Sequence, residues 1–179
     1  MQELNKIESS ILGFSKFQFK VFGDERGFFS QWFQENTNHA ELKGFKVRQA
    51  NLSKSTKGTI RGIHYSDNSH PQKKLITCVE GSIIDYGVDV RKGSLTRGRY
   101  DKFILSEGDG NSIFIDHGIG HAFEVTSESA TIVYLLSEIW RPDLEYAIYP
   151  LDKDLDIAWE SQIPILSDKD RQAEKFNTL

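Results

Sequence analysis

Cysteine is almost missing from this chain of 179 residues, and Cys78 is the only one. A single cysteine excludes an intramolecular disulfide, which fits a reducing compartment. Cys78 lies in the apolar run 75–79, where a buried structural thiol is favoured over a nucleophile. The chain also lacks an apolar signal region at its N-terminus and an apolar run of membrane-spanning length. We therefore expect a cytoplasmic protein.

An excess of basic residues is also lacking, since 22 Lys and Arg face 26 Asp and Glu, for a net charge of −4. Nucleic acids and anionic membranes select basic surfaces, so neither is expected as a partner. A small anionic ligand is not excluded, because a few local cations are enough to bind it. Repeats, low-complexity tracts and proline-rich linkers are missing as well, and the length predicts one domain over residues 1–179.

Helical periodicity is rare, and most of the chain consists of short β segments separated by Gly, Asn, Asp and Ser. Strands at this spacing predict an all-β sandwich or barrel. Short helices are expected only near 35–42 and within 166–176. The barrel is expected over about 15–140, with 141–179 as a tail that wraps it. The expected strands are 14–22, 28–34, 46–53, 58–65, 73–80, 82–90, 100–106, 112–116, 120–126 and 129–138.

The chain has five histidines, and histidines in a β-barrel raise the question of a bound metal. Metal-binding barrels of the cupin type present His-x-His with a carboxylate close behind. Here the strand positions that face the same way as His64 are Gly62 and Ser66. Two histidines without neighbouring carboxylates make a poor set of metal ligands, so we expect neither a metal nor another cofactor.

His64 can act as a general base instead, because imidazole titrates near neutral pH. By position alone, a lone histidine in a strand is more often a satisfied core residue. The surrounding segment 49–74 favours a functional interpretation, because an apolar interior would not tolerate its many polar side chains. We predict a wet pocket with cations for an anionic group; the alternative is a solvated strand face. The polar residues of this segment include Gln49, Asn51, Ser53, Arg61 and Lys74.

Short motifs follow one another in order over about residues 15–172. They are Asp24-Glu25-Arg26-Gly27-Phe28-Phe29, Gln49-x-Asn51-x-Ser53, Arg61-Gly62-Ile63-His64-Tyr65, Val88-Asp89-Val90-Arg91-Lys92-Gly93-Ser94, Gly118-Ile119-Gly120-His121-Ala122-Phe123, Tyr134-Leu135-Leu136-Ser137 and Leu166-Ser167-Asp168-Lys169-Asp170. Each motif alone is weak, but the ordered series closely resembles the dTDP-4-dehydrorhamnose 3,5-epimerase family of nucleotide-sugar biosynthesis.

The resemblance implies a metal-free jelly-roll β-barrel of the cupin type (a double-stranded β-helix) that forms a homodimer. This agrees with the missing His-x-His pattern. It implies an isomerase that epimerises a nucleotide-diphospho-4-keto-6-deoxysugar at C3 and C5. The product would enter deoxysugar and surface-polysaccharide biosynthesis, such as that of a lipopolysaccharide O-antigen.

The resemblance also implies roles at matching positions. His64 corresponds to the base that removes the protons at C3 and C5, and Asp170 to the carboxylate that orients it. Lys74 corresponds to the cation that stabilises the enolate oxygen. Tyr134 corresponds to the acid that returns a proton on the opposite face, as inversion requires. The positions that match substrate-binding residues are Arg26, Gln49, Asn51, Arg61 and His121.

Two further expected substrate contacts depart from the family pattern. Gln31 stands where a glutamate near the nucleotide base is usual, and Trp140 where a second tyrosine is common. These departures leave open the nucleotide and the number of centres inverted. The alternatives are an epimerase acting only at C3 or C5 of a different nucleotide sugar, a related 3,4-ketoisomerase, a non-catalytic sugar-nucleotide-binding barrel and, last, a metal-dependent cupin oxygenase. The complete set of His64, Tyr134 and Asp170 favours epimerisation.

Overall fold

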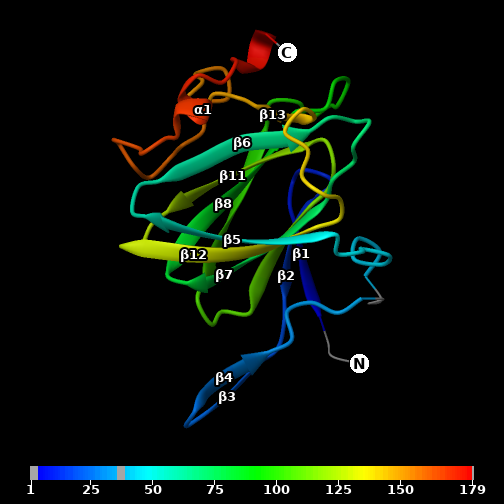
Figure 1. The fold of residues 1–179 in the computed structure, drawn as a ribbon, viewed down its shortest axis with the longest axis vertical. Helices are drawn as coiled ribbons and strands as arrows, with labels where there is room; N and C mark the ends of the chain where they lie inside the picture. Colours follow the sequence, from blue (N-terminus) through cyan, green and yellow to red (C-terminus); the bar gives the residue numbers. More distant parts are fainter. Residues whose placement is uncertain (1–3, 36–38, 179) are drawn as a thin grey trace.

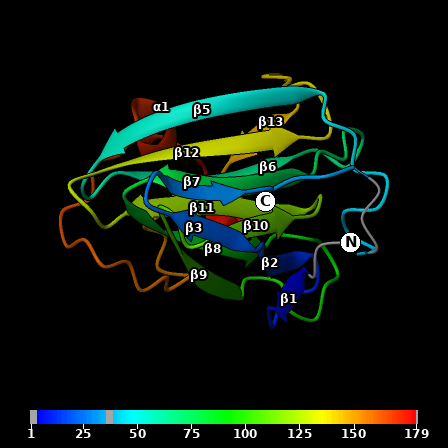
Figure 2. The same cartoon turned by 90° about the horizontal axis from the view of Figure 1, so that it is seen from below.

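Two antiparallel sheets face each other in the computed structural model, which describes residues 4–35 and 39–178 (Figures 1 and 2). They form the expected all-β jelly roll, and the fold prediction is confirmed. The six-stranded sheet has the order β1 (Asn5–Glu8), β2 (Phe14–Gln18), β10 (Asn111–Ile115), β7 (Lys74–Glu80), β12 (Ser129–Leu136) and β5 (Gln49–Thr56). The five-stranded sheet has the order β13 (Glu145–Ala147), β6 (Ile60–Ser66), β11 (Ile119–Val125), β8 (Ser82–Asp89) and β9 (Tyr100–Ser106).

The predicted strands match the structure best at 73–80 and 100–106, which correspond to β7 and β9. The expected strand 14–22 is instead divided between β2 and the first strand of a separate hairpin, β3 (Val21–Asp24) and β4 (Gly27–Ser30). Between the two strands, the backbone N–H of Phe19 donates to the carbonyl of Gly110 and the Phe19 ring is buried. Strands β1 and β13 were not predicted, because three or four residues are too few to show an alternating pattern.

In the part of the chain that the structure describes, helical turns occur only after residue 167. The helix expected within 166–176 is a single turn, α1 (Asp168–Arg171), followed by the 3₁₀ turn η1 (Phe176–Thr178). Of the helix expected near 35–42, residues 36–38 lie outside the described residues, and 39–44 form turns. Among the residues described, none of the helices reaches the length and apolar character needed to cross a membrane.

The space between the sheets is filled by an apolar cluster that includes Phe14, Ile76 and Phe123. Cys78 belongs to this cluster and is buried, as expected. Burial raises the pKa of its thiol to about 11, which suits a structural residue rather than a nucleophile. The cluster also forms one side of a polar cavity, since Phe123 and Ile132 contribute to both.

Each sheet is covered on its outer face as well. Leu42 and Phe45 pack with Phe114 outside the six-stranded sheet, whereas Leu155 and Phe176 of the tail pack with residues of the five-stranded sheet. Central strands such as β11 are therefore buried along their whole length and show no alternation. The tail contacts the barrel directly, but the assignment of residues 1–179 to one domain stays a prediction.

The β3–β4 hairpin stands apart from the barrel and projects away from it (Figure 1, blue). Its phenylalanines Phe22, Phe28 and Phe29 are 47%, 58% and 66% exposed. Arg26 lies in the connecting turn and is ion-paired with Asp24 of the same hairpin. An exposed aromatic hairpin of this kind marks an interaction surface.

Candidate active site

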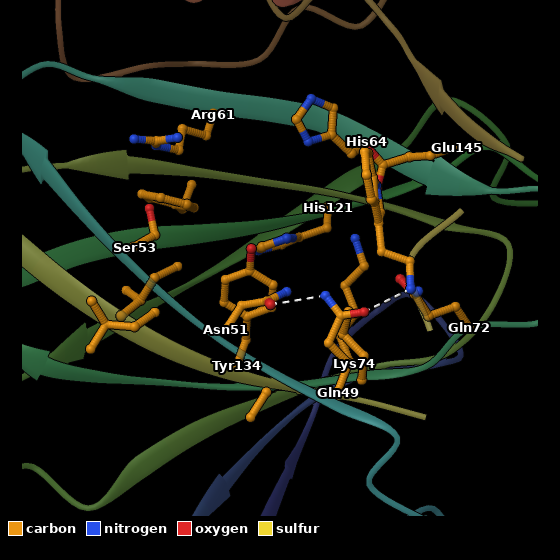
Figure 3. Close-up of a pocket in the computed structure, with 16 residues that line it drawn as sticks. Gln49, Asn51, Ser53, Arg61, His64, Gln72, Lys74, His121, Tyr134 and Glu145 are labelled. Atoms are coloured by element: carbon orange, nitrogen blue, oxygen red, sulfur yellow. Dashed lines mark hydrogen bonds between the residues drawn. The ribbon is translucent and has the colours of Figure 1, made fainter. Parts of the chain in front are cut away.

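A cavity of about 560 Å³ opens between the two sheets and is lined by residues of both (Figure 3). It brings together most of the predicted site residues, although they come from separate strands. Its polar and ionisable lining consists of Gln49, Asn51, Ser53, Arg61, His64, Gln72, Lys74, His121, Tyr134, Trp140 and Glu145. The volume is in the range of small-molecule binding sites.

His64 is paired with Asp170, as predicted. The Nε2 atom of His64 lies 2.6 Å from Oδ1 of Asp170, which is contributed by α1. Burial acts to raise the pKa of Asp170, but the hydrogen bond and charge of His64 outweigh it, so this pKa is lowered. Because an ionised carboxylate only accepts, Nε2 carries the proton and Nδ1 of His64 is left with a free lone pair.

Glycine at position 62 lets β6 approach β11 closely. A Cβ at Gly62 would lie 2.5 Å from the carbonyl oxygen of His121 and 2.6 Å from Cβ of Ala122, and its φ is +128°. Only glycine fits this backbone position. Two residues further along, His64 is then in register with His121 on the neighbouring strand. The close approach therefore places both histidines on one wall of the cavity.

The six-stranded sheet forms the opposite wall and carries Tyr134 and Lys74, on β12 and β7 respectively (Figure 3). Asn51 is in register with Tyr134 and receives a hydrogen bond of 2.9 Å from the Gln49 amide. Burial lowers the pKa of Lys74, while the charges of acidic neighbours act to raise it. The imidazole of His64 and the phenol of Tyr134 therefore line the cavity from different sheets.

A second histidine–carboxylate pair lies beside the first. Nε2 of His121 is 2.9 Å from Oδ2 of Asp85, whose other oxygen, Oδ1, is buried and has no hydrogen-bond partner among the described residues. Burial raises the pKa of Asp85 against the opposing charges of His121 and Lys74. Over residues 4–35 and 39–178, no three His, Cys, Asp or Glu side chains are grouped so that they could hold a metal ion.

Trp140 is held at the edge of the cavity by two hydrogen bonds. Its backbone N–H donates to Oε1 of Gln49 at 2.8 Å, and its indole Nε1 donates to Oε2 of Glu145 at 3.0 Å. Glu145 also forms an ion pair of 2.9 Å with Lys169. The predicted contact residue Trp140 is therefore fixed by neighbours on both sides of the opening.

Sequence reasoning did not single out Asp85 or Glu145. A signal was available for Asp85, because it is a carboxylate between Ile84 and Tyr86 in the middle of a mostly apolar strand. Glu145 gave no such signal, since it lies in an acidic, proline-containing tail without a clear pattern. Its position becomes evident only when β13 pairs with β6.

Two predicted contact residues do not line this cavity. The Arg26 side chain is 85% exposed in the hairpin turn, and Gln31 is exposed just after β4. Neither residue reaches the cavity of its own chain, since the hairpin projects away from the barrel (Figure 1).

The protein-family model of dTDP-4-dehydrorhamnose 3,5-epimerase matches residues 8–178 of this chain. A dTDP-4-dehydrorhamnose 3,5-epimerase of Shigella flexneri is 41% identical over 175 residues, which are 97% of this chain and 96% of that protein. A dTDP-4-dehydrorhamnose 3-epimerase of Streptomyces niveus is 40% identical over 84% of this chain and 73% of its own. A 3,5-epimerase from Legionella pneumophila, solved with dTDP-4-keto-L-rhamnose, has a TM-score of 0.90 at 35% identity, covering 98% of this chain and 94% of that one.

Proposed function

Because this chain belongs to the dTDP-4-dehydrorhamnose 3,5-epimerase family of carbohydrate epimerases, we propose that it inverts both C3 and C5 of a dTDP-4-keto-6-deoxysugar. The observation that carries the proposal is the placement of His64 and Tyr134 on opposite walls of one cavity. Such an arrangement can remove a proton from one face of a sugar ring and return one to the other. The product feeds deoxysugar and surface-polysaccharide biosynthesis, and the enzyme works in the cytoplasm.

His64 starts the reaction as the general base. Its unprotonated Nδ1 takes the proton from C3, which is acidic because it adjoins the 4-keto group. The electron pair of the C–H bond moves into an enolate, so negative charge develops on the ketone oxygen. Lys74 stabilises that oxygen as a fixed cation, and Asp170 stabilises the imidazolium that forms on His64.

Tyr134 completes the inversion. Its hydroxyl gives a proton to C3 from the face opposite His64, and the ketone re-forms as the electrons return from the oxygen. Return of a proton from His64 would only restore the starting sugar. His64 then releases its proton to water and Tyr134 regains one from water. With both groups reset, the same two steps at C5, on the other side of the ketone, invert the second centre.

The nucleotide diphosphate lies beyond the sugar, near Arg61, Asn51 and Gln49. The Arg61 guanidinium is oriented by a 2.9 Å hydrogen bond from Nε to the Ser55 hydroxyl, which leaves its terminal nitrogens for phosphate oxygens. His121 contacts the sugar, next to His64 on the same wall.

A second candidate function is inversion at C3 alone, and Trp140 favours it. Its indole lies where the family often has a second tyrosine, and an indole N–H has no useful acidity. The Streptomyces niveus relative, a 3-epimerase, shows that a protein 40% identical to this chain carries this activity.

Deuterium exchange distinguishes the two candidates. The protein is incubated with dTDP-4-keto-6-deoxyglucose in deuterated water, and exchange at C3 and C5 is followed by NMR. We expect exchange and inversion at both carbons. Exchange at C3 alone establishes the second candidate, and the GDP- and UDP-linked analogues test the nucleotide. No exchange with any of these sugars would overturn the catalytic proposal.

The β3–β4 hairpin leads to a proposal about assembly. Its exposed phenylalanines and its distance from the cavity of its own chain favour a homodimer in which Arg26 and Gln31 reach the cavity of the partner. The partner hairpin then closes the nucleotide end of the site.

Mixed dimers test this assembly. Arg26→Ala is expected to lower activity because it removes a contact at the nucleotide end of the site. His64→Ala is expected to lower activity because it removes the base. If the hairpin serves the partner, mixing the two variants after dissociation restores one complete site in each mixed dimer, and activity rises well above that of either variant. If activity does not rise although mixed dimers are shown by mass, the hairpin does not act across the dimer.

A further inference from the structure

Glu145 is an acidic residue of the cavity for which the proposed reaction has no use. It lies on β13 in register with Ser66, next to the strand that carries His64, and its side chain is only 15% exposed. One carboxylate oxygen accepts from the Trp140 indole at 3.0 Å, and the other from Lys169 Nζ at 2.9 Å. Both oxygens are therefore occupied, and the carboxylate has a fixed orientation toward the cavity.

Lys74 projects from β7 into the same cavity that Glu145 lines, and both side chains are labelled in Figure 3. Withdrawal from water favours its neutral amine, and two carboxylates oppose this effect, Glu145 more strongly than Asp85. Lys169 acts in the opposite direction and lowers the pKa of Lys74. The other titratable or charged groups that line the same cavity are Arg61, His64, His121 and Tyr134.

The two carboxylates are not equivalent. Asp85 is committed to His121, and burial raises its own pKa. Glu145 stays ionised, because Lys169, Lys74 and His64 together outweigh the effect of burial and lower its pKa. The dependable negative charge near Lys74 is therefore that of Glu145.

We propose that Glu145 is a positioning residue for the epimerisation: its carboxylate holds Trp140 as one wall of the cavity and provides the negative counter-charge to Lys74 in the same cavity. The proposal rests on the proposed function, in which Lys74 stabilises the enolate oxygen. Only the ammonium form can do so, because a neutral amine has no charge to oppose that of the oxygen. Glu145 acts through Lys74 and Trp140 and does not itself exchange a proton with the sugar.

Glu145→Gln tests the charge while keeping an oxygen that can accept from Trp140. Removing the negative charge lowers the pKa of Lys74, so activity that needs the ammonium is lost at a lower pH. We expect the alkaline limb of the kcat profile to shift downward by about one pH unit. The pKa of Lys74 itself is measured without substrate, by NMR of ¹³C-labelled lysine, with the signal assigned by its loss in Lys74→Met.

Lys169→Met is the matched control, because it breaks the same ion pair from the other side. If Glu145 acts by its charge on Lys74, this variant moves the alkaline limb upward, opposite to Glu145→Gln. If the ion pair only anchors α1, the two variants have the same effect, and the proposal is overturned. Glu145→Asp retains the charge and is expected to retain most of the wild-type pH profile.

The lysine NMR signal separates failure of this proposal from failure of the proposed function. An unchanged Lys74 titration in Glu145→Gln overturns the role of Glu145, whatever the activity. A shifted titration in a protein that exchanges no deuterium with any 4-keto sugar overturns the proposed reaction and leaves the effect of Glu145 on Lys74 established.

Discussion

Replacement of His64 by alanine is expected to lower deuterium exchange at both C3 and C5 by about 10³-fold or more. One base serves both centres in the proposed mechanism, so both exchanges fall together. The loss follows from the geometry, because Asp170 fixes the proton of His64 on Nε2 at 2.6 Å and leaves Nδ1 as the proton acceptor. NMR of a 4-keto sugar nucleotide in deuterated water measures both positions in one experiment.

His117→Ala provides a matched histidine control. His117 is exposed, is paired with Asp116 and does not line the cavity, so exchange close to that of the wild type is expected. Exchange at one carbon that survives in His64→Ala would contradict the single-base mechanism. His121, in register with His64, would then be the candidate for the second base.

Tyr134→Phe is expected to separate exchange from inversion. Without the hydroxyl, proton return on the face opposite His64 is lost, and inversion falls by about 10²-fold or more. The base is intact, so it still removes a proton and returns a deuteron from its own side. Deuterium therefore accumulates in the starting sugar without a change of configuration, which NMR of the recovered substrate detects.

Tyr146→Phe is the comparison for this variant, since Tyr146 stacks on Tyr65 and lies outside the cavity. It is expected to invert the sugar as the wild type does. Full inversion by Tyr134→Phe would exclude the acid role. Loss of exchange as well as inversion would mean that the Tyr134 hydroxyl is needed for proton removal.

The sequence was a good guide to the strands and a poorer one to their ends. Runs such as 73–80 have the β-branched and apolar residues that a buried strand requires, and they are strands in the structure. The jelly-roll fold came from the family resemblance, and the order of the strands was not predicted, because pairing depends on contacts between distant residues. Short elements such as β13 are determined by their pairing partner and not by local sequence.

The site was predicted to the extent that motifs marked it. His64, Lys74 and Tyr134 line one cavity as expected, and Asp170 reaches His64 although 106 residues separate them. Glu145 was missed, because its partners Trp140 and Lys169 define its role and are recognisable only in three dimensions. The roles of the cavity residues in the reaction stay predictions, which the variants described above test.

The position of Asp170 after the barrel strands has a consequence for protein synthesis. The strands that line the cavity are synthesised, at about 5–20 residues per second, before α1, which follows them in the chain. A nascent chain can therefore assemble the walls of the cavity while His64 still lacks its carboxylate. In the proposed mechanism, proteolytic cleavage between β13 and α1 is likewise expected to abolish activity while the barrel strands stay intact.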